Sequence, residues 1–463
     1  MQIQLFRLLF GSLIVISISA RVKAQNSAPS PFSGKGQIGN MITIDDNTAF
    51  GHIVVGSLNE AFVVLNQKGQ LLWSEPIRGY IKGEGKWNGN VIFFYTEKSN
   101  GGPLHAAIVD VKEKKIIKDK IIYDIPKKPG GDIYVQNDPG HNFSHLLFRS
   151  NESAPLITMI TLSADMEIYT KVLLPADSRI FIGIHTSKQG DIFLTSMVEG
   201  KLITEQFDRE GESKNKLQVD LDVRNKSYFT AVSRLDTFTN NTLVAIQYVN
   251  ANKDKAINLY RFDFDAEKVK AAPPVLLDKA YFGTLEEKEP DAKKRLKPID
   301  EMVPVDILTT QDKVVLVKEI RTTYSTTRST AALNTAAVVS VFNKELKPLH
   351  ETVLNKSYQA YASFNSHLIS FIHNEKLYVL SPESDAGIAN YSDYCYIIDL
   401  SADKKERKKL PNAGGLIDAA STVWFKNSCI LGSLYKDFAM EKGKTNLRIM
   451  TYEEIDKLVN AER

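Results

Sequence analysis

The sequence predicts an all-β fold, a β-propeller of eight blades or alternatively seven, and three observations lead to this expectation. A short unit recurs along the chain, in which an apolar strand, a polar turn and a second strand follow one another. A further apolar strand precedes each copy, so each unit can form a small antiparallel sheet. Helical periodicity is nearly absent. Units of about 40–50 residues with several strands and regular turn signals are the sequence signature of a propeller.

The repeated unit is clearest at residues 63–73, which read VVLNQKGQLLW. Its turn carries Asn66 and Gly69. Asn hydrogen-bonds to its own backbone, and Gly accepts the left-handed conformation that such turns need. We count eight copies, spaced by about 40 to 80 residues. The strands upstream of the copies are expected at 51–55, 90–95, 145–149, 191–195, 242–246, 313–317, 367–371 and 428–432.

The two ends of the repeat region fix the expected domain boundaries. A strand at 41–44 is expected to pair into the last blade and close the ring, which removes a free sheet edge. The propeller then covers residues 41–451, after a flexible lead-in at 25–40 that is rich in Ser, Pro and Gly. A helical tail is expected at 452–463. A β-sandwich, or two tandem all-β domains, is the alternative, because the copies diverge strongly.

Residues 1–24 have the pattern of a secretory signal peptide, with a basic residue, a short apolar run and small residues before the cut. The run at 8–18 is shorter than the roughly 20 residues that span a bilayer. Cleavage after Ala24 would give a soluble mature chain with no transmembrane segment, exported to the periplasm or the cell exterior. The alternative is a buried strand or an anchor helix.

Loss of the leader changes the charge balance. The leader holds three basic residues and no acid, so its removal brings the formal net charge from +3 to about zero. A nearly neutral chain has no global field that would attract nucleic acid or an acidic membrane surface. We therefore expect a protein or glycan ligand and no nucleic-acid partner.

The first unit also resembles the repeat of quinoprotein-type propellers. In residues 65–73 a Gly-containing turn precedes a strand that bears Trp73, and in that family the Trp docks between blades. The family includes quinone-dependent dehydrogenases and BamB-like scaffolds of outer-membrane assembly. The adjacent cysteine pair of many quinone enzymes is absent from this chain. The resemblance therefore implies the architecture, and no catalytic residue or cofactor is carried over.

Four histidines are binding candidates: His52, His145, His185 and His367. They lie at or near the starts of the expected upstream strands, which in a propeller gather around one end of the central channel. Four converging imidazoles could bind a metal or an anionic ligand. The alternative is four unrelated histidines, exposed or hydrogen-bonded in separate blades, and we therefore predict no metal site.

Acidic residues offer a catalytic alternative. Asp236, Asp300 and Asp306 stand near similar positions, and paired carboxylates could act as general acid and base at the channel mouth. The chain contains no Gly-x-Ser-x-Gly pentapeptide of the kind that carries a hydrolase nucleophile. Solvated loop acids explain the same residues, so we name no catalytic residue and favour a protein that is not an enzyme.

The most unusual stretch is residues 321–335, which holds six threonines, two arginines and one tyrosine between two strong strands. Such a polar, β-prone hairpin is expected to project from the disc. Arg321, Tyr324 and Arg328 are candidate contact residues, because Arg and Tyr are enriched at protein interfaces. The alternative is a tolerated surface insertion.

The two cysteines, Cys395 and Cys429, are compatible with one disulfide in an oxidising compartment. Two free thiols buried in strands are the alternative, because Cys is often a core residue. Taken together, the sequence favours an exported binding or scaffold propeller of a bacterial-type cell envelope. The rival is a carbohydrate-active or other hydrolytic propeller with acids at the channel mouth.

Overall fold

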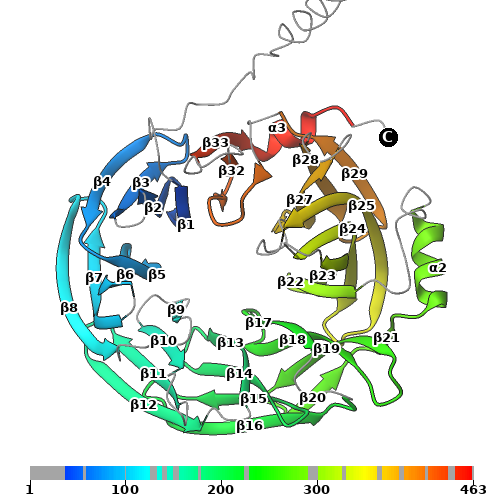
Figure 1. The fold of residues 1–463 in the computed structure, drawn as a ribbon, viewed down its shortest axis with the longest axis horizontal. Helices are drawn as coiled ribbons and strands as arrows, with labels where there is room; N and C mark the ends of the chain where they lie inside the picture. The colour runs from blue at the N-terminus through cyan, green and yellow to red at the C-terminus, as the bar shows by residue number, and fades with distance from the viewer. Residues whose placement is uncertain are drawn as a thin grey trace, which may run out of the picture.

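The fold is known from a computed structural model, which describes residues 37–55, 59–99, 101–125, 133–137, 143–149, 156–175, 179–223, 229–289, 301–325, 330–361, 368–384, 391–411, 416–435 and 444–460. Eight antiparallel sheets follow one another around a ring (Figure 1). The prediction of an eight-bladed propeller is therefore confirmed, and a sandwich or tandem-domain arrangement is excluded.

The first four blades follow the chain order from the innermost strand to the outermost. Their strands are β1 (Gln37–Asp45), β2 (Thr48–Val55), β3 (Asn59–Asn66), β4 (Leu71–Ile77), β5 (Tyr80–Trp87), β6 (Asn90–Lys98), β7 (Gly101–Asp110), β8 (Lys115–Ile125), β9 (Tyr134–Asn137), β10 (Phe143–Arg149), β11 (Leu156–Ser163), β12 (Ile168–Pro175), β13 (Arg179–Thr186), β14 (Ile192–Val198), β15 (Lys201–Phe207) and β16 (Ser213–Asp220).

The last four blades contain β17 (Phe229–Asp236), β18 (Asn241–Val249), β19 (Lys255–Asp263), β20 (Lys268–Ala271), β21 (Val275–Leu276), β22 (Glu301–Thr309), β23 (Lys313–Ser325), β24 (Thr330–Asn343), β25 (Pro348–Tyr361), β26 (Ile369–His373), β27 (Lys376–Ser384), β28 (Tyr391–Asp399), β29 (Lys404–Lys409), β30 (Leu416–Ile417), β31 (Val423–Trp424), β32 (Ser428–Tyr435) and β33 (Lys444–Thr451). Two helices complete the described chain, α2 (Lys279–Lys288) outside the sixth blade and α3 (Tyr452–Lys457) after β33 (Figure 1).

The stretch VVLNQKGQLLW forms the hairpin that joins β3 to β4, because Asn66 and Gly69 stabilise its turn. The Asn66 side-chain oxygen accepts hydrogen bonds from the backbone N–H groups of Lys68, at 2.9 Å, and Gln70, at 3.0 Å. Gly69 has a φ of 68°, in the left-handed region that favours glycine. Trp73 on β4 packs edge-on against Phe62, with ring centroids 4.7 Å apart, at the interface of the first two blades.

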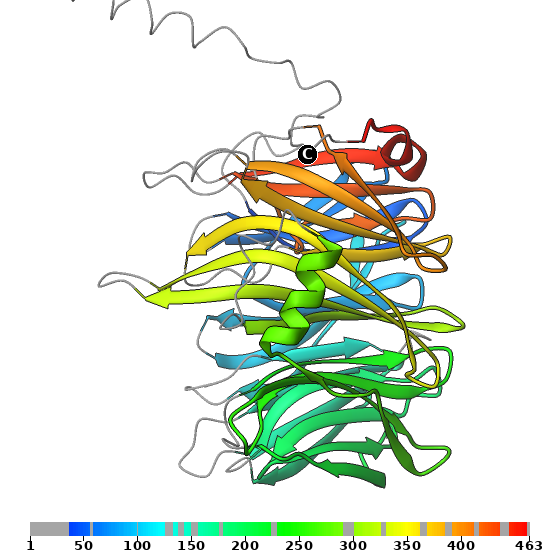
Figure 2. The ribbon, with the colours of Figure 1, turned by 90° about the vertical axis from the view of Figure 1, so that its right-hand side faces the viewer.

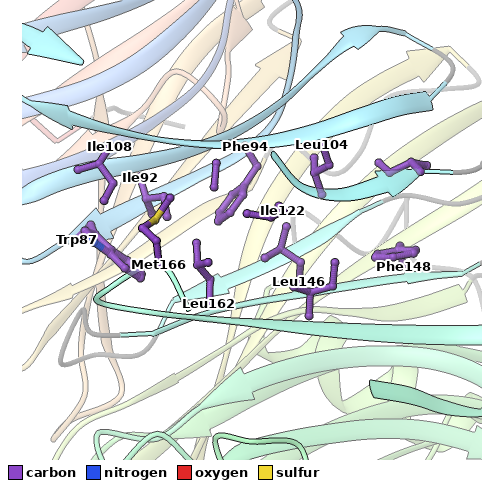
Figure 3. Packing of buried hydrophobic residues seen from close by; sticks show 13 residues of the cluster. Trp87, Ile92, Phe94, Leu104, Ile108, Ile122, Leu146, Phe148, Leu162 and Met166 are labelled. Carbon is purple, nitrogen blue, oxygen red and sulfur yellow. The ribbon is translucent and has the colours of Figure 1, made fainter. Parts of the chain in front are cut away.

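Apolar side chains fill the interfaces between neighbouring blades. Figure 3 shows the cluster between the second and third blades, which extends from Trp87 beside Met166 at one end to Phe148 at the other. Full burial of a large apolar side chain contributes about 1.5–3 kcal/mol. Because each sheet packs on both of its faces, the middle strands are apolar on both sides, and this explains the short continuous apolar runs in the sequence.

The ring closes differently from the expectation. The N-terminal strand β1 is the innermost strand of the first blade, hydrogen-bonded to β2, and it does not pair into the last blade. Closure comes instead from side chains: Ile38 and Met41 of β1 pack against Val423 and Phe425 of the last blade. β1 begins at Gln37, inside the region that was expected to be a lead-in.

The last blade also ends in an unusual way. Within the described residues it has β30 and β31 at its inner edge, then β32 and β33, and the chain continues into α3. A capping box between Thr451 and Glu454 starts this helix. Among the described residues, neither helix is long and apolar enough to cross a membrane.

Candidate functional site

The candidate histidines lie in separate environments. His52 on β2 faces Glu84, with 3.5 Å between His52 Nδ1 and Glu84 Oε2. His145 on β10 has no exposed surface, and its Nδ1 lies 3.0 Å from Thr161 Oγ1. His185 on β13 makes a 2.8 Å contact to a serine of the fifth blade. His367 lies outside the described residues.

The three described histidines, His52, His145 and His185, therefore do not form one site. In the part of the chain that the structure describes, no group of three or more His, Cys, Asp or Glu side chains is placed to hold a metal ion. Burial lowers the pKa of His145 to about 3 and that of His185 to about 4, so both are neutral near pH 7. Their role in the structure is to make buried hydrogen bonds.

The acids are held in separate structural contacts. Asp236 has no exposed surface and lies 2.8 Å from Lys344 Nζ, while Thr239 Oγ1 donates to it at 2.9 Å. Asp306 accepts a 2.6 Å hydrogen bond from Ser370 of the next blade, and burial raises its pKa. Asp300 lies outside the described residues. Asp236 and Asp306 thus serve different contacts and do not form a carboxylate pair.

A cavity of about 460 Å³ opens into the centre of the ring. The innermost strands of five blades, β1, β5, β9, β26 and β31, contribute its walls. Its polar residues are Glu84, Lys86, Gln136 and Asn137, together with two threonines. This channel cavity lies within the range of roughly 300–1,000 Å³ that is usual for small-ligand sites.

Two stacked aromatic rings form one wall of the channel cavity. Phe371 on β26 and Trp424 on β31 have ring centroids 4.7 Å apart and planes only 5° from parallel. Tyr452 of α3 lies parallel to Phe371 at 6.0 Å and holds the pair from outside the cavity lining. Both cavity-lining rings are partly exposed.

The opposite wall is built around Glu84 of β5. Its side chain is 1% exposed, and its Oε1 accepts a hydrogen bond from Asn40 of the first blade. The neighbouring Gly85 is required because a Cβ there would overlap the side chain of Asn137. Sequence reasoning did not single out these residues. The alternation of charged residues with glycines in YIKGEGKW could have indicated this part of the site, because Gly within a strand marks a place where a ligand or another chain segment comes close to the backbone.

The polar hairpin of the sixth blade extends from the disc. β23 and β24 are 13 and 14 residues long, and their pairing continues to Ser325 and Thr330. Figure 2 shows these strands reaching beyond the neighbouring blades on one side of the ring. Arg321 and Tyr324 lie on this part of β23. Arg328 lies outside the described residues.

Cys395 and Cys429 are free thiols in the structure. They come from β28 and β32, and both are fully buried in the core cluster between the seventh and eighth blades. Burial raises the pKa of the Cys429 thiol to about 12 and also raises that of Cys395. The structure thus has the two buried thiols of the alternative interpretation.

No protein-family model matches the chain, and no curated protein sequence matches it. Among solved structures, the WD40 domain of SCAP from fission yeast is 12% identical, with a TM-score of 0.44 over 92% of this chain and 95% of that one. The β-propeller domain of the Trilobed protease from Pyrococcus furiosus is 9% identical, with a TM-score of 0.43 over 83% and 98%.

A structure from a study of two prolyl endopeptidases is 11% identical, with a TM-score of 0.44 over 90% of this chain and 55% of that one. At such identities these similarities concern the fold alone. They do not confirm the quinoprotein-type resemblance of the first unit.

Proposed function

We propose that this chain is an exported propeller of a bacterial-type cell envelope that binds a partner protein through one face of its ring. The observation that carries the proposal is the extension of the sixth blade. Among the described residues, β22 pairs with β23 as far as Arg321, and beyond that point the pairing continues between β23, β24 and β25. We call this extension the tongue, and define it as residues 321–325, 330–334 and 358–361.

The tongue is suited to binding because its base is rigid. A hairpin alone is marginally stable in water, whereas three paired strands anchored in a core hold their shape. At the base, Ile320 and Ala336 are fully buried. Lys356 donates to Glu319, and neither side chain has exposed surface.

A further observation supports binding over catalysis. Asp236 and Asp306, which the hydrolytic alternative would need, are already engaged in contacts to Lys344 and Ser370. The leader at residues 1–24 supports export, and mature protein would begin at Gln25.

The test is crosslinked capture from envelope extract with mature protein, residues 25–463, followed by mass spectrometry. The Arg321→Ala/Arg328→Ala variant is compared with Arg209→Ala, an exposed arginine on the turn between β15 and β16. We expect one stoichiometric partner, with capture reduced about tenfold or more by the tongue variant and unchanged by the control. Absence of a partner above background, or equal capture by all three proteins, would contradict the proposal.

A further inference from the structure

We infer that the channel cavity binds a neutral saccharide, with a sugar ring against the Phe371–Trp424 wall and its hydroxyl groups hydrogen-bonded by Glu84 and Gln136. This site lies at the ring centre and is independent of the tongue. Three features of the cavity support this ligand class: an aromatic wall, a buried carboxylate, and a lining whose charges balance.

The aromatic wall fits the apolar face of a sugar. Phe371 and Trp424 stack on each other in nearly parallel planes and are both partly exposed, so they form a rigid aromatic wall that Tyr452 supports. The faces of aromatic rings are electron-rich and attract the weakly positive C–H groups of a pyranose face. Because β26 and β31 position these rings from two different blades, the wall is fixed by the ring architecture.

Glu84 provides the second observation. Glu84 lines the channel cavity, and its Oε2 is buried with no hydrogen-bond donor among the described residues. A buried acceptor without a donor costs about 1–3 kcal/mol, more when it is charged, and a ligand hydroxyl would remove that cost. His52 Nδ1 lies 3.5 Å from this oxygen, within ion-pair distance, and neither of the two atoms has a hydrogen-bond partner among the described residues.

The rest of the lining suits hydroxyl groups, which both donate and accept. Gln136 presents a side-chain amide, with a donor and an acceptor, and donates at 3.0 Å to the backbone carbonyl of Asn137. β1, β5 and β9 each stand at the inner edge of their sheets, so one row of backbone N–H and C=O groups on each strand faces the channel.

The charge balance selects against other ligand classes. Glu84 and Lys86 are the charged residues that line the channel cavity, and their charges cancel. With one positive and one negative side chain, the lining has no net charge that would favour an anion or a cation over a neutral ligand. A purely apolar ligand would leave Glu84 Oε2 buried without a donor. A neutral, polyhydroxylated molecule with one apolar face satisfies every part of the lining.

Tryptophan fluorescence and titration calorimetry test the inference. Trp87 is 3% exposed in the core and Trp73 lies between blades, so Trp424 is the tryptophan that lines the channel cavity. Mature protein is titrated with glucose, galactose, mannose, N-acetylglucosamine and their β-1,4-linked disaccharides, and with glucuronate as the anionic probe. We expect saturable binding of at least one neutral sugar at a Kd of about 1 mM or tighter, and no binding of glucuronate in this range.

Variants locate the binding. Glu84→Gln and Gln136→Ala are expected to weaken it about tenfold or more. The control is Gln218→Ala, which removes an exposed glutamine on β16, and it is expected to leave sugar binding unchanged. If Glu84→Gln fails to fold, the partly exposed Gln136 still supplies the test. Failure of every sugar to bind, tighter binding of glucuronate, or full binding by Gln136→Ala would overturn the inference. Partner capture through the tongue is measured without sugar, so failure of the saccharide inference can be distinguished from failure of the proposed partner binding.

Discussion

Replacement of Lys356 by methionine is predicted to destabilise the base of the tongue strongly. Lys356 and Glu319 form an ion pair in which neither side chain has exposed surface. Methionine has a similar volume but no charge, so the variant leaves the Glu319 carboxylate buried without its partner. Breaking a buried pair in this way costs about 3–5 kcal/mol. That cost corresponds to a change in the unfolding equilibrium of about a hundredfold to several thousandfold.

The assay is urea unfolding followed by far-UV circular dichroism, with the midpoint compared at an unchanged slope. Lys201→Met is the matched control, because its pair with Asp220 spans 3.6 Å between side chains that are 47% and 77% exposed. Breaking such a surface pair costs about 0–1 kcal/mol. Glu319→Leu combined with Lys356→Met should recover most of the loss, since no lone charge is then buried. If the urea midpoint of Lys356→Met falls no further than that of Lys201→Met, the predicted cost of the unpaired buried charge is refuted.

Three further predictions concern packing, pH and the thiols. Gly85→Ala is expected to lower the free energy of unfolding by about 1–3 kcal/mol, because the new Cβ displaces the Asn137 side chain. Adding Asn137→Ala in the same chain should recover part of this loss, as measured by urea titration. The pKa of His145 is about 3 in the folded chain, below its ordinary value of about 6.5 in the unfolded chain. As the pH falls from about 6.5 toward 3, the unfolded chain takes up a proton that the folded chain does not, and the free energy of unfolding therefore decreases. Between pH 7 and pH 5, His145→Gln should lose about 2 kcal/mol less than the parent chain, and equal losses would contradict this. Cys395 and Cys429 should react with a thiol reagent in guanidinium and not in the native state, whereas an unreactive denatured chain would indicate a disulfide.

The repeat and its turns could be predicted from the sequence because their causes are local. The Asn66 side chain bonds to the backbone of its own turn, and Gly69 adopts the conformation that the turn requires. Alternation of apolar strands with such turns was enough to give eight sheets. The projecting hairpin was also predictable, because a long polar segment between two strong strands has no core to enter.

Ring closure and the site could not be predicted, because they depend on contacts between distant blades. The sequence of β1 is compatible with either end of the ring; in the structure a two-residue turn pairs it with β2, and Ile38 and Met41 pack on the last blade. Glu84 and Trp424 are far apart in sequence and line one cavity only once the ring is formed. The histidines appeared equivalent by position, yet His145 lies on β10, the second strand of its blade, and is buried in the core, whereas His185 lies on the innermost strand β13.

The most direct test of the central claim is photocrosslinking in cells that export the chain from its own leader. A photoreactive amino acid replaces Tyr324 on the tongue in one strain. In the other it replaces Phe238, which is 57% exposed on the β17–β18 turn at the opposite face. The account predicts a discrete adduct in the envelope fraction from position 324 only, on a chain that begins at Gln25. Identical adducts from both positions, no adduct from 324, or a cytosolic chain that retains residues 1–24 would contradict it.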